Sequence, residues 1–205
     1  MKKRLFIGCY NKSVILTYLG VLSSCIGIYF SFNKNFRIVF ICLIISAICD
    51  LFDGMIARKC KRNEIEKQFG VQIDSLSDMV SFVIFPICVL YSISNSWKNI
   101  LIGSLYAVLG ITRLAWFNIR ESEEESKRYF RGLPVTYTAL ILAIVYLLNC
   151  LITRRVGNII YQVVFLIMSI AFVGNFKLRK PYGIFYIIYG VLAVISIIGI
   201  MFLGV

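Results

Sequence analysis

Long apolar stretches separated by short polar segments dominate the hydrophobic pattern of the chain. Each of seven stretches comes near or exceeds the ~17–25 residues that a helix needs to cross the hydrocarbon core of a bilayer. They cover about Val14 to Phe32, Phe36 to Ala57, Val71 to Ser94, Ile100 to Asn118, Leu133 to Ile152, Gly157 to Asn175 and Tyr182 to Val205. We therefore predict an all-α fold, a polytopic transmembrane helical bundle.

Composition supports a membrane protein. Hydrophobic residues make up 60% of the chain and the mean hydropathy is +0.84, whereas about 45–50% apolar residues is usual in soluble domains. Seven helices leave almost no residues for a soluble domain, so the chemistry must lie inside the bundle or at its rim. Residues 1–13 are basic and partly apolar, and we expect them to form a segment that lies along the membrane interface.

Lysine and arginine placement predicts the orientation, because cytoplasmic loops carry an excess of these residues. Of 22 such residues, only Lys34, Arg37, Lys98, Arg154 and Arg155 fall in the segments opposite to the N-terminus. We therefore expect a multi-pass protein of the cell membrane with a cytoplasmic N-terminus. The net charge of +12 either reflects this orientation alone or also attracts anionic lipid. No motif or basic domain predicts nucleic-acid binding.

Four aspartates are the candidate functional residues. Asp50, Asp53, Asp74 and Asp78 are the only aspartates in the chain, and each lies in or beside an apolar run. Spacings of three and four place each pair on one helix face. If the helices form an antiparallel hairpin, both pairs reach a similar depth and can face each other. Ionised carboxylates there are costly unless cations compensate them, which indicates a functional site.

Divalent cations are the simplest compensation for these carboxylates. An all-oxygen ligand set favours hard ions such as Mg²⁺, Mn²⁺ or Ca²⁺, and a bridged pair of ions would suit phosphoryl chemistry. Gly54 leaves room for a ligand near the helix backbone, although it could equally be a packing contact. A solvated acidic loop is a poorer explanation, because the polar loop itself is expected to contain Glu64 and Glu66 instead.

The pattern Asp50-x-x-Asp53-Gly54-x-x-Ala57-Arg58, followed by Gly70-x-x-x-Asp74-x-x-x-Asp78, resembles the signature of the CDP-alcohol phosphatidyltransferase family. The 11 residues between Arg58 and Gly70 are more than the family usually has there. Two further stretches, Arg113 to Ile119 and Phe130 to Ala139, are similar to membrane-embedded bacterial phosphatidylserine synthases. The resemblance implies a six-helix core at about 14–175, with an additional C-terminal transmembrane helix at 182–205.

This resemblance implies an enzyme, a CDP-diacylglycerol–serine O-phosphatidyltransferase, that transfers a phosphatidyl group from CDP-diacylglycerol to L-serine and releases CMP. The four aspartates would hold two Mg²⁺ or Mn²⁺ ions, and Asp78 would also accept the serine hydroxyl proton as the catalytic base. The CDP-diacylglycerol pocket would be lined by Gly54, Ala57, Arg58 and Gly70, with Asn11 and Thr17 as additions. The active site would face the cytoplasm.

Three residues in or just after the fourth apolar stretch are candidates for binding the acceptor carboxylate or the lipid phosphate. Arg113, Asn118 and Arg120 stand near a helix end, where an arginine pairs well with such groups. Ordinary anchoring and helix capping would explain them too, above all Arg120. Pro134 begins the next predicted helix, and the Phe130 to Pro134 segment either shapes the acceptor pocket or only enters the membrane.

Other functions remain open at this stage. The same chemistry could use glycerol 3-phosphate or an inositol phosphate as acceptor. A divalent-cation transporter could also carry intramembrane aspartates, but its ion path should continue across the bilayer, and the last three apolar stretches contain no acidic residue. The family resemblance also implies a homodimer, which cross-linking in membranes would test; recovery of monomer alone would count against it.

Overall fold

The structure, a computed structural model, describes residues 7–60, 62–120, 129–151, 153–179 and 184–203. The fold is helical, as predicted. Its elements are α1 (Lys12–Phe32), α2 (Phe36–Lys59), α3 (Glu64–Asp78), the π-helix η1 (Met79–Ile84), α4 (Phe85–Ile93), α5 (Trp97–Arg120), β1 (Tyr129–Arg131), α6 (Tyr137–Asn149), α7 (Arg154–Val173), β2 (Lys177–Arg179) and α8 (Ile184–Leu203).

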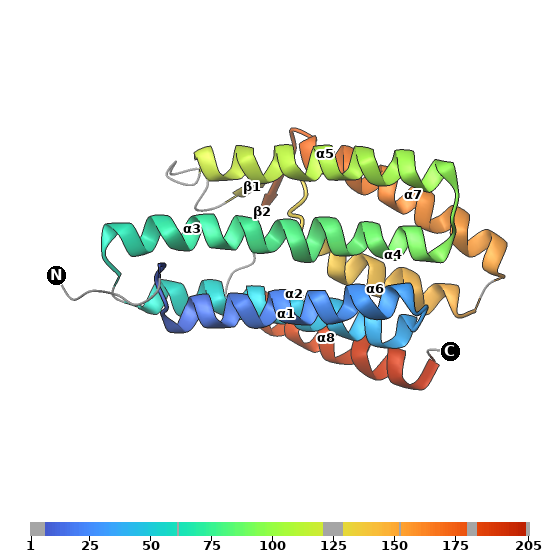
Figure 1. Ribbon diagram of the computed structural model, residues 1–205, viewed down its shortest axis with the longest axis horizontal. Helices are drawn as coiled ribbons and strands as arrows, with labels where there is room; N and C mark the ends of the chain where they lie inside the picture. The colour runs from blue at the N-terminus through green and yellow to red at the C-terminus, as the bar shows by residue number, and fades with distance from the viewer. Residues whose placement is uncertain (1–6, 61, 121–128, 152, 180–183, 204–205) are drawn as a thin grey trace.

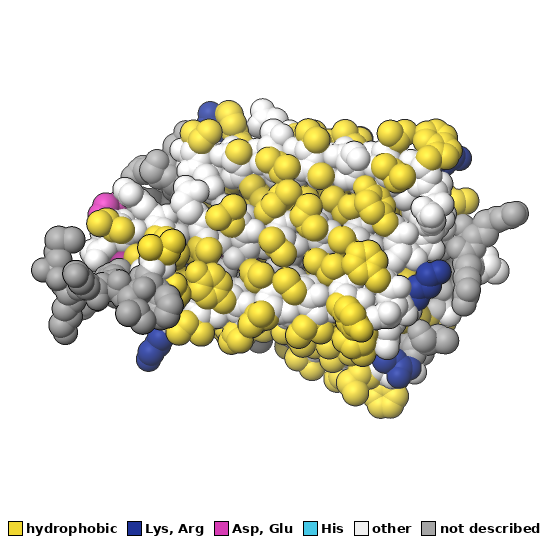
Figure 2. Space-filling model, in the orientation of Figure 1, with side chains coloured by type: hydrophobic (Ala, Val, Ile, Leu, Met, Phe, Trp, Pro, Cys, Tyr) yellow, Lys and Arg dark blue, Asp and Glu magenta, His cyan; other side chains and the backbone are white. Residues whose placement is uncertain are grey.

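The protein is a multi-pass membrane protein. Five helical segments of the described residues are long and apolar enough to cross a bilayer, namely Lys12–Phe32, Phe36–Lys59, Glu64–Ile93, Trp97–Arg120 and Val156–Val173. Of the remaining two apolar stretches, one forms the shorter apolar helix Tyr137–Asn149, and the other contains the apolar segment Gly190–Phe202 of α8. Figure 2 shows hydrophobic side chains over the middle of one face, with charged side chains near its two ends. The predicted interfacial segment, residues 1–13, lies partly outside the described residues, which begin at residue 7.

The helices run side by side along the long axis of the molecule (Figure 1). α3, η1 and α4 form one continuous run, with α1, α2 and α8 on one side and α5 and α7 on the other. α1 packs mainly against α2, α5 packs against α7, and α8 packs against α2 and α6. α2 and α3 follow one another in the chain and run in opposite directions, but α3 packs against α1 and α5.

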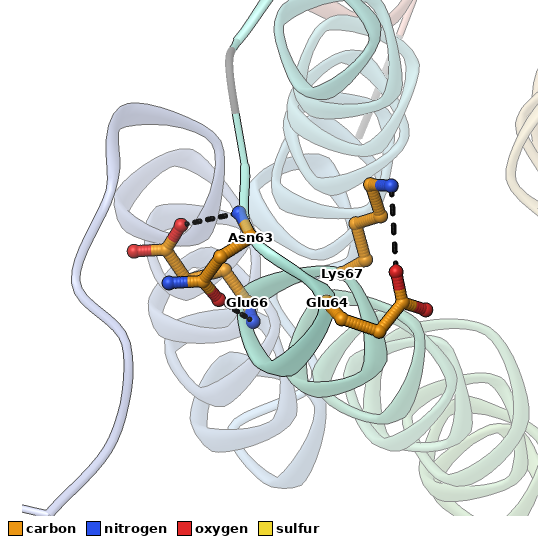
Figure 3. Close-up of polar contacts among 4 residues, drawn as sticks. All are labelled: Asn63, Glu64, Glu66 and Lys67. Carbon is orange, nitrogen blue, oxygen red and sulfur yellow. Dashed lines mark hydrogen bonds and ion pairs between the residues drawn. The ribbon is translucent and has the colours of Figure 1, made fainter.

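The start of α3 differs from the sequence interpretation. Glu64 and Glu66, expected in a polar loop, form the first turn of this helix. The Asn63 side chain accepts a hydrogen bond from the Glu66 N–H at 2.8 Å, and the Glu66 carboxylate accepts one from the Asn63 N–H at 3.0 Å (Figure 3). This capping box pairs two N–H groups that the helix cannot pair itself, so the helix begins seven residues before the predicted span at Val71. Lys67 forms an ion pair with Glu64 at 3.5 Å.

A buried hydroxyl cluster joins α1, α2 and η1. The Ser24 hydroxyl lies 2.9 Å from that of Ser46 and donates to that of Ser81 at 2.8 Å, and Ser46 donates to the carbonyl of Gly20 at 2.9 Å. Because a buried hydroxyl without a partner is costly, such contacts fix how the three helices meet. They hold the segment that directly follows Asp78.

Pro86 interrupts the pattern of backbone hydrogen bonds in the helix that follows η1. It has no N–H to donate, and the carbonyl of Phe82, four residues earlier, accepts a hydrogen bond from the Tyr106 hydroxyl at 2.9 Å. The Tyr106 hydroxyl also lies 2.7 Å from the Thr138 hydroxyl. These bonds connect η1, α5 and α6 in the core, where Tyr106 and Phe82 are fully buried.

A two-stranded antiparallel sheet, which the sequence did not predict, joins the segment before α6 to the segment after α7. Tyr129 pairs with Arg179, and the Leu133 N–H donates to the Ala171 carbonyl at 2.8 Å. Gly132 has a positive φ of 71°, and a Cβ there would lie 2.4 Å from the Phe172 carbonyl oxygen, so only glycine fits this turn. The turn carries the chain from β1 to α6 past the aspartates.

Candidate active site

The aspartates converge from two helices. Asp50 and Asp53 come from α2, and Asp74 and Asp78 come from α3. One carboxylate oxygen each of Asp50, Asp53 and Asp74 lie within 4.8 Å of one another. Asp53 and Asp78 are buried, whereas Asp50 and Asp74 are half-buried. The helical spacing read from the sequence therefore does bring the carboxylates to one place.

Helix α1 holds one of these carboxylates in place. The Thr17 hydroxyl donates a hydrogen bond to Oδ2 of Asp53, and its oxygen also lies 3.1 Å from the carbonyl oxygen of Ser13. A carboxylate that accepts a fixed hydrogen bond keeps one rotamer, which prepares it for a ligand. Thr17, predicted only through the family resemblance, thus contacts the site directly.

Arg113 supplies positive charge next to the carboxylates. It projects from α5, is only 7% exposed, and interacts electrostatically with Asp78, Asp50 and Asp74. Its guanidinium carbon lies 4.9 Å from the ring centre of Phe117 and 5.9 Å from that of Phe130. Its Nε has no hydrogen-bond partner among the described residues, so the group retains a donor for a ligand.

The residues present fit a divalent ion. Three carboxylate oxygens within 4.8 Å of each other can converge on one cation, and hard oxygen ligands are those that Mg²⁺, Mn²⁺ and Ca²⁺ take. One arginine cannot neutralise four nearby carboxylates. Asp50, Asp53 and Asp74 could therefore hold a metal ion, and Asp78 lies beside this group.

One large pocket, of about 1030 Å³, contains most of the predicted site. Besides the four aspartates it is lined by Thr17, Gly54, Ala57, Arg58, Gly70 and Arg113. A Cβ at Gly54 would meet only the Arg58 Nη1, at 3.9 Å, so the backbone of α2 is open to a ligand there. A Cβ at Gly70 would lie 2.9 Å from the Arg62 Nη1, which places the Arg62 head beside Gly70.

Three predicted residues are not among the described residues that line this pocket. Asn11 caps α1 and accepts hydrogen bonds from the Val14 N–H and the Ser13 hydroxyl. Asn118 accepts a hydrogen bond from the Ser75 hydroxyl at 2.8 Å, which joins α5 to α3. The Arg120 guanidinium lies 4.4 Å from the Trp116 ring centre. For these residues the structure offers capping and packing contacts.

The pocket also includes residues that sequence reasoning did not assign to it. Ser13, Arg62 and Phe117 line it, as do apolar residues of α2, the start of α6 and α8. The signature pattern gave no signal for Arg62 or α8, because both lie outside its fixed positions. Phe130 and Pro134, proposed to shape the pocket or merely to enter the membrane, do line it.

Comparison with known proteins places this arrangement in a family. The family model for CDP-alcohol phosphatidyltransferase matches residues 10–175. The chain belongs to the CDP-alcohol phosphatidyltransferase family. The resemblance first seen in the aspartate signature is therefore confirmed.

Curated relatives carry related names. Archaetidylserine synthase of Methanothermobacter thermautotrophicus is 33% identical over 135 residues, which is 65% of this chain and 56% of the relative. CDP-diacylglycerol–serine O-phosphatidyltransferase of Saccharomyces cerevisiae is 33% identical over 112 residues, 50% of this chain and 40% of the relative. The enzyme of that name from Methanocaldococcus jannaschii is 28% identical over 188 residues, 91% of this chain and 84% of the relative. The chain thus spans about half the length of the first two.

Proposed function

We propose that this phosphatidyltransferase makes phosphatidylserine and CMP from CDP-diacylglycerol and L-serine. The observation that carries the proposal is the carboxylate cluster of α2 and α3 facing buried Arg113 within one pocket. The names of the relatives support serine as the acceptor, because both names describe transfer to serine.

The donor would bind at the polar end of the pocket. Divalent ions held by Asp50, Asp53 and Asp74 would, when bound, supply positive charge for the pyrophosphate and for departing CMP. Arg58 and Arg62 stand beside Gly54 and Gly70 in the pocket wall, where guanidinium groups can bind phosphate oxygens. The two glycines and Ala57 leave room for the nucleotide along the helix backbones.

Asp78 would act as the general base. The serine hydroxyl oxygen attacks the phosphorus that carries diacylglycerol, while Asp78 accepts the hydroxyl proton. The bond from that phosphorus to the bridging oxygen breaks, and CMP leaves with the electron pair. A free alcohol is a weak nucleophile near neutral pH, so a carboxylate within hydrogen-bond reach accelerates this step. Asp78 suits the role because it is buried beside, and not within, the three-oxygen group.

Arg113 would bind the carboxylate of serine. Its position over Phe117 and Phe130 orients the guanidinium, and its Nε retains a hydrogen-bond donor. A guanidinium matches a carboxylate with two parallel hydrogen bonds. Asn118 and Arg120, which contact Ser75 and Trp116, would support α5 from outside the pocket.

The same assay also tests other acceptors and donors. Three arginines line the described pocket, so a phosphorylated acceptor such as glycerol 3-phosphate or an inositol phosphate is the main alternative. The name of one relative points to a donor with archaeal lipid chains. Family membership argues against a divalent-cation transporter.

The test is release of CMP by the purified protein. The protein is incubated with CDP-diacylglycerol and Mg²⁺ or Mn²⁺, together with serine, glycerol 3-phosphate, inositol or inositol phosphate in separate reactions. We expect CMP and phosphatidylserine with serine, and no CMP in the presence of a chelator. CMP release with another acceptor but none with serine would refute the serine assignment.

A further inference from the structure

Helix α1 joins the two helices that carry the aspartates. Within the described part of the chain, α2 and α3 make few packing contacts with each other, although each supplies one pair of carboxylates. α1 packs mainly against α2 and also contacts α3, η1 and α4. The distance between the carboxylates of α2 and those of α3 therefore depends on how each helix is attached to α1.

The inner face of α1 consists of small residues. Six buried residues follow one another along the helix at alternating spacings of four and three, namely Ser13, Thr17, Gly20, Ser24, Gly27 and Ser31. This spacing places them in one stripe, whereas large apolar residues such as Leu19 and Leu22 are more than half exposed. Because small side chains let helix backbones approach closely, α1 can lie against several helices at once.

Two side chains of this stripe form hydrogen bonds to the helices of the aspartates. Thr17 donates to Asp53 on α2, and Ser24 donates to Ser81 in η1 at 2.8 Å. Seven residues separate Thr17 from Ser24, so both lie on the same face of α1, two turns and roughly 10 Å apart. One side chain of α1 thus holds α2, and the other holds the continuous run of α3 and η1.

The hydrogen bond to Ser81 lies at the turn where the helix after α3 changes its geometry. In η1 the Phe85 N–H donates to the carbonyl of Val80, five residues earlier. A π-helical turn contains more residues than an α-helical turn, so it changes how the helix is rotated about its axis. Ser24 and Ser81 are 0% and 3% exposed, which leaves no water to replace a lost bond. The bond therefore fixes the wide turn against α1.

We propose that Ser24 is a positioning residue for the metal-binding carboxylates. Its hydrogen bond to Ser81 places Asp74 at the distance from the carboxylates of α2 that a shared ion requires. The inference rests on the proposed function, because it takes the aspartates to hold divalent ions. Neither serine is among the described residues that line the pocket, so both act through the placement of the helices.

The test is the binding of Mn²⁺ to the purified protein in the absence of donor and acceptor. The electron paramagnetic resonance signal of free Mn²⁺ gives the Kd. Loss of a group that positions a metal ligand typically weakens metal binding by about 10- to 100-fold, so Ser24→Ala and Ser81→Ala should each raise the Kd about tenfold. Ser24→Cys has a side chain of similar size with a weaker donor, and its Kd should fall between those of Ser24→Ala and the wild type.

Ser23→Ala is the matched control. Ser23 precedes Ser24 on α1, is 8% exposed, and donates to the carbonyl of Cys42 on α2 at 3.0 Å. Removal of either hydroxyl deletes one buried hydrogen bond, so both variants should lower the midpoint of thermal unfolding similarly. Only Ser24→Ala should weaken Mn²⁺ binding. An unchanged Kd in Ser24→Ala, or equal weakening in both variants, would overturn the proposal.

The proposed function fails separately. The Mn²⁺ titration contains no acceptor, so the absence of CMP release with serine would leave the comparison of the variants unchanged. If the wild type releases CMP with serine and Ser24→Ala keeps the wild-type Kd, the proposed function stands and the positioning role is rejected. If the wild type binds no Mn²⁺, the metal site is wrong and this inference is rejected with it.

Discussion

Asp78 differs from the other three aspartates in its surroundings. It is buried and lies outside the close group of carboxylate oxygens that Asp50, Asp53 and Asp74 form. Arg113 interacts electrostatically with Asp50 and Asp74 as well as with Asp78. η1 begins directly after it, and π-helical turns often occur at functional sites. The wider turn and the Ser24–Ser81 hydrogen bond hold the helix where Asp78 projects.

Replacement of Asp78 by Asn should therefore remove catalysis and spare donor binding. Asn has nearly the same shape but cannot accept the hydroxyl proton, so we expect turnover to fall by about 10²- to 10⁴-fold. CMP release measures turnover, and stabilisation against heat by CDP-diacylglycerol measures binding. As a comparison, Asp74→Asn should instead raise the Mn²⁺ concentration needed for activity. Turnover near the wild-type rate in Asp78→Asn would remove Asp78 from the base role.

At the residue scale, the sequence predicted best those features that depend on local helix geometry. The spacing of the aspartates fixed their faces, and the structure confirms that three of their oxygens meet. Contacts between distant segments were not predictable in the same way. That Thr17 donates to Asp53, and that Asn118 accepts from Ser75, depends on how α1 and α5 pack. No local pattern specifies such packing.

At the scale of the elements, α1 can approach α4 closely because residue 27 of α1 is a glycine. A Cβ at Gly27 would lie 2.2 Å from Cζ of Phe85, whose ring is fully buried. α1 carries Thr17 to the site, and α4 continues the helix of Asp78. The close approach of these helices therefore contributes to the geometry of the pocket at a distance from it.

Gly27→Ala should destabilise the protein, although alanine is the better helix former. Overpacking of a buried ring typically costs about 1–3 kcal/mol, so the midpoint of thermal unfolding in detergent should fall. Gly190→Ala is the matched control, because it is also a helical glycine and its new Cβ meets nothing within 4 Å. If both variants unfold at the same temperature, the Gly27–Phe85 contact does not limit the packing of α1 against α4.

The sequence predicted long elements well and short ones poorly. Apolar runs of about twenty residues predicted the α1, α2 and α5 segments to within a few residues. β1 and β2 have three residues each, too few for an alternating pattern to be visible. α6 begins later than the apolar stretch at Leu133, because the turn at Gly132 and Pro134 occupies its first residues.

At the scale of the whole molecule, the proposed reaction needs a site that both a lipid donor and a water-soluble acceptor can reach. The turn between α2 and α3 lies at one end of the bundle, and the connections after α1, α4 and α6 lie at the other (Figure 1). The aspartates stand on the α2 and α3 helices, and apolar residues of α2 that line the same pocket, such as Ile44 and Ile48, lie nearer the second end. A donor lipid would keep its chains in the membrane while its head group reaches an acceptor from water.

The orientation of the bundle decides which compartment supplies that acceptor. The α2–α3 end carries Arg58, Lys59, Arg62 and Lys67, and the positive-inside rule predicts that this end is cytoplasmic. A reporter fused after Arg62 should therefore report the cytoplasm, and one fused after Arg155 should report the opposite side. A fusion after Lys34, in the turn after α1, is the control and should agree with the one after Arg155. If the fusions after Arg62 and Arg155 report the same side, an odd number of the helices between them does not cross the membrane. If both Arg155 and Lys34 report the cytoplasm and Arg62 does not, the site faces outward and serine would have to come from outside the cell.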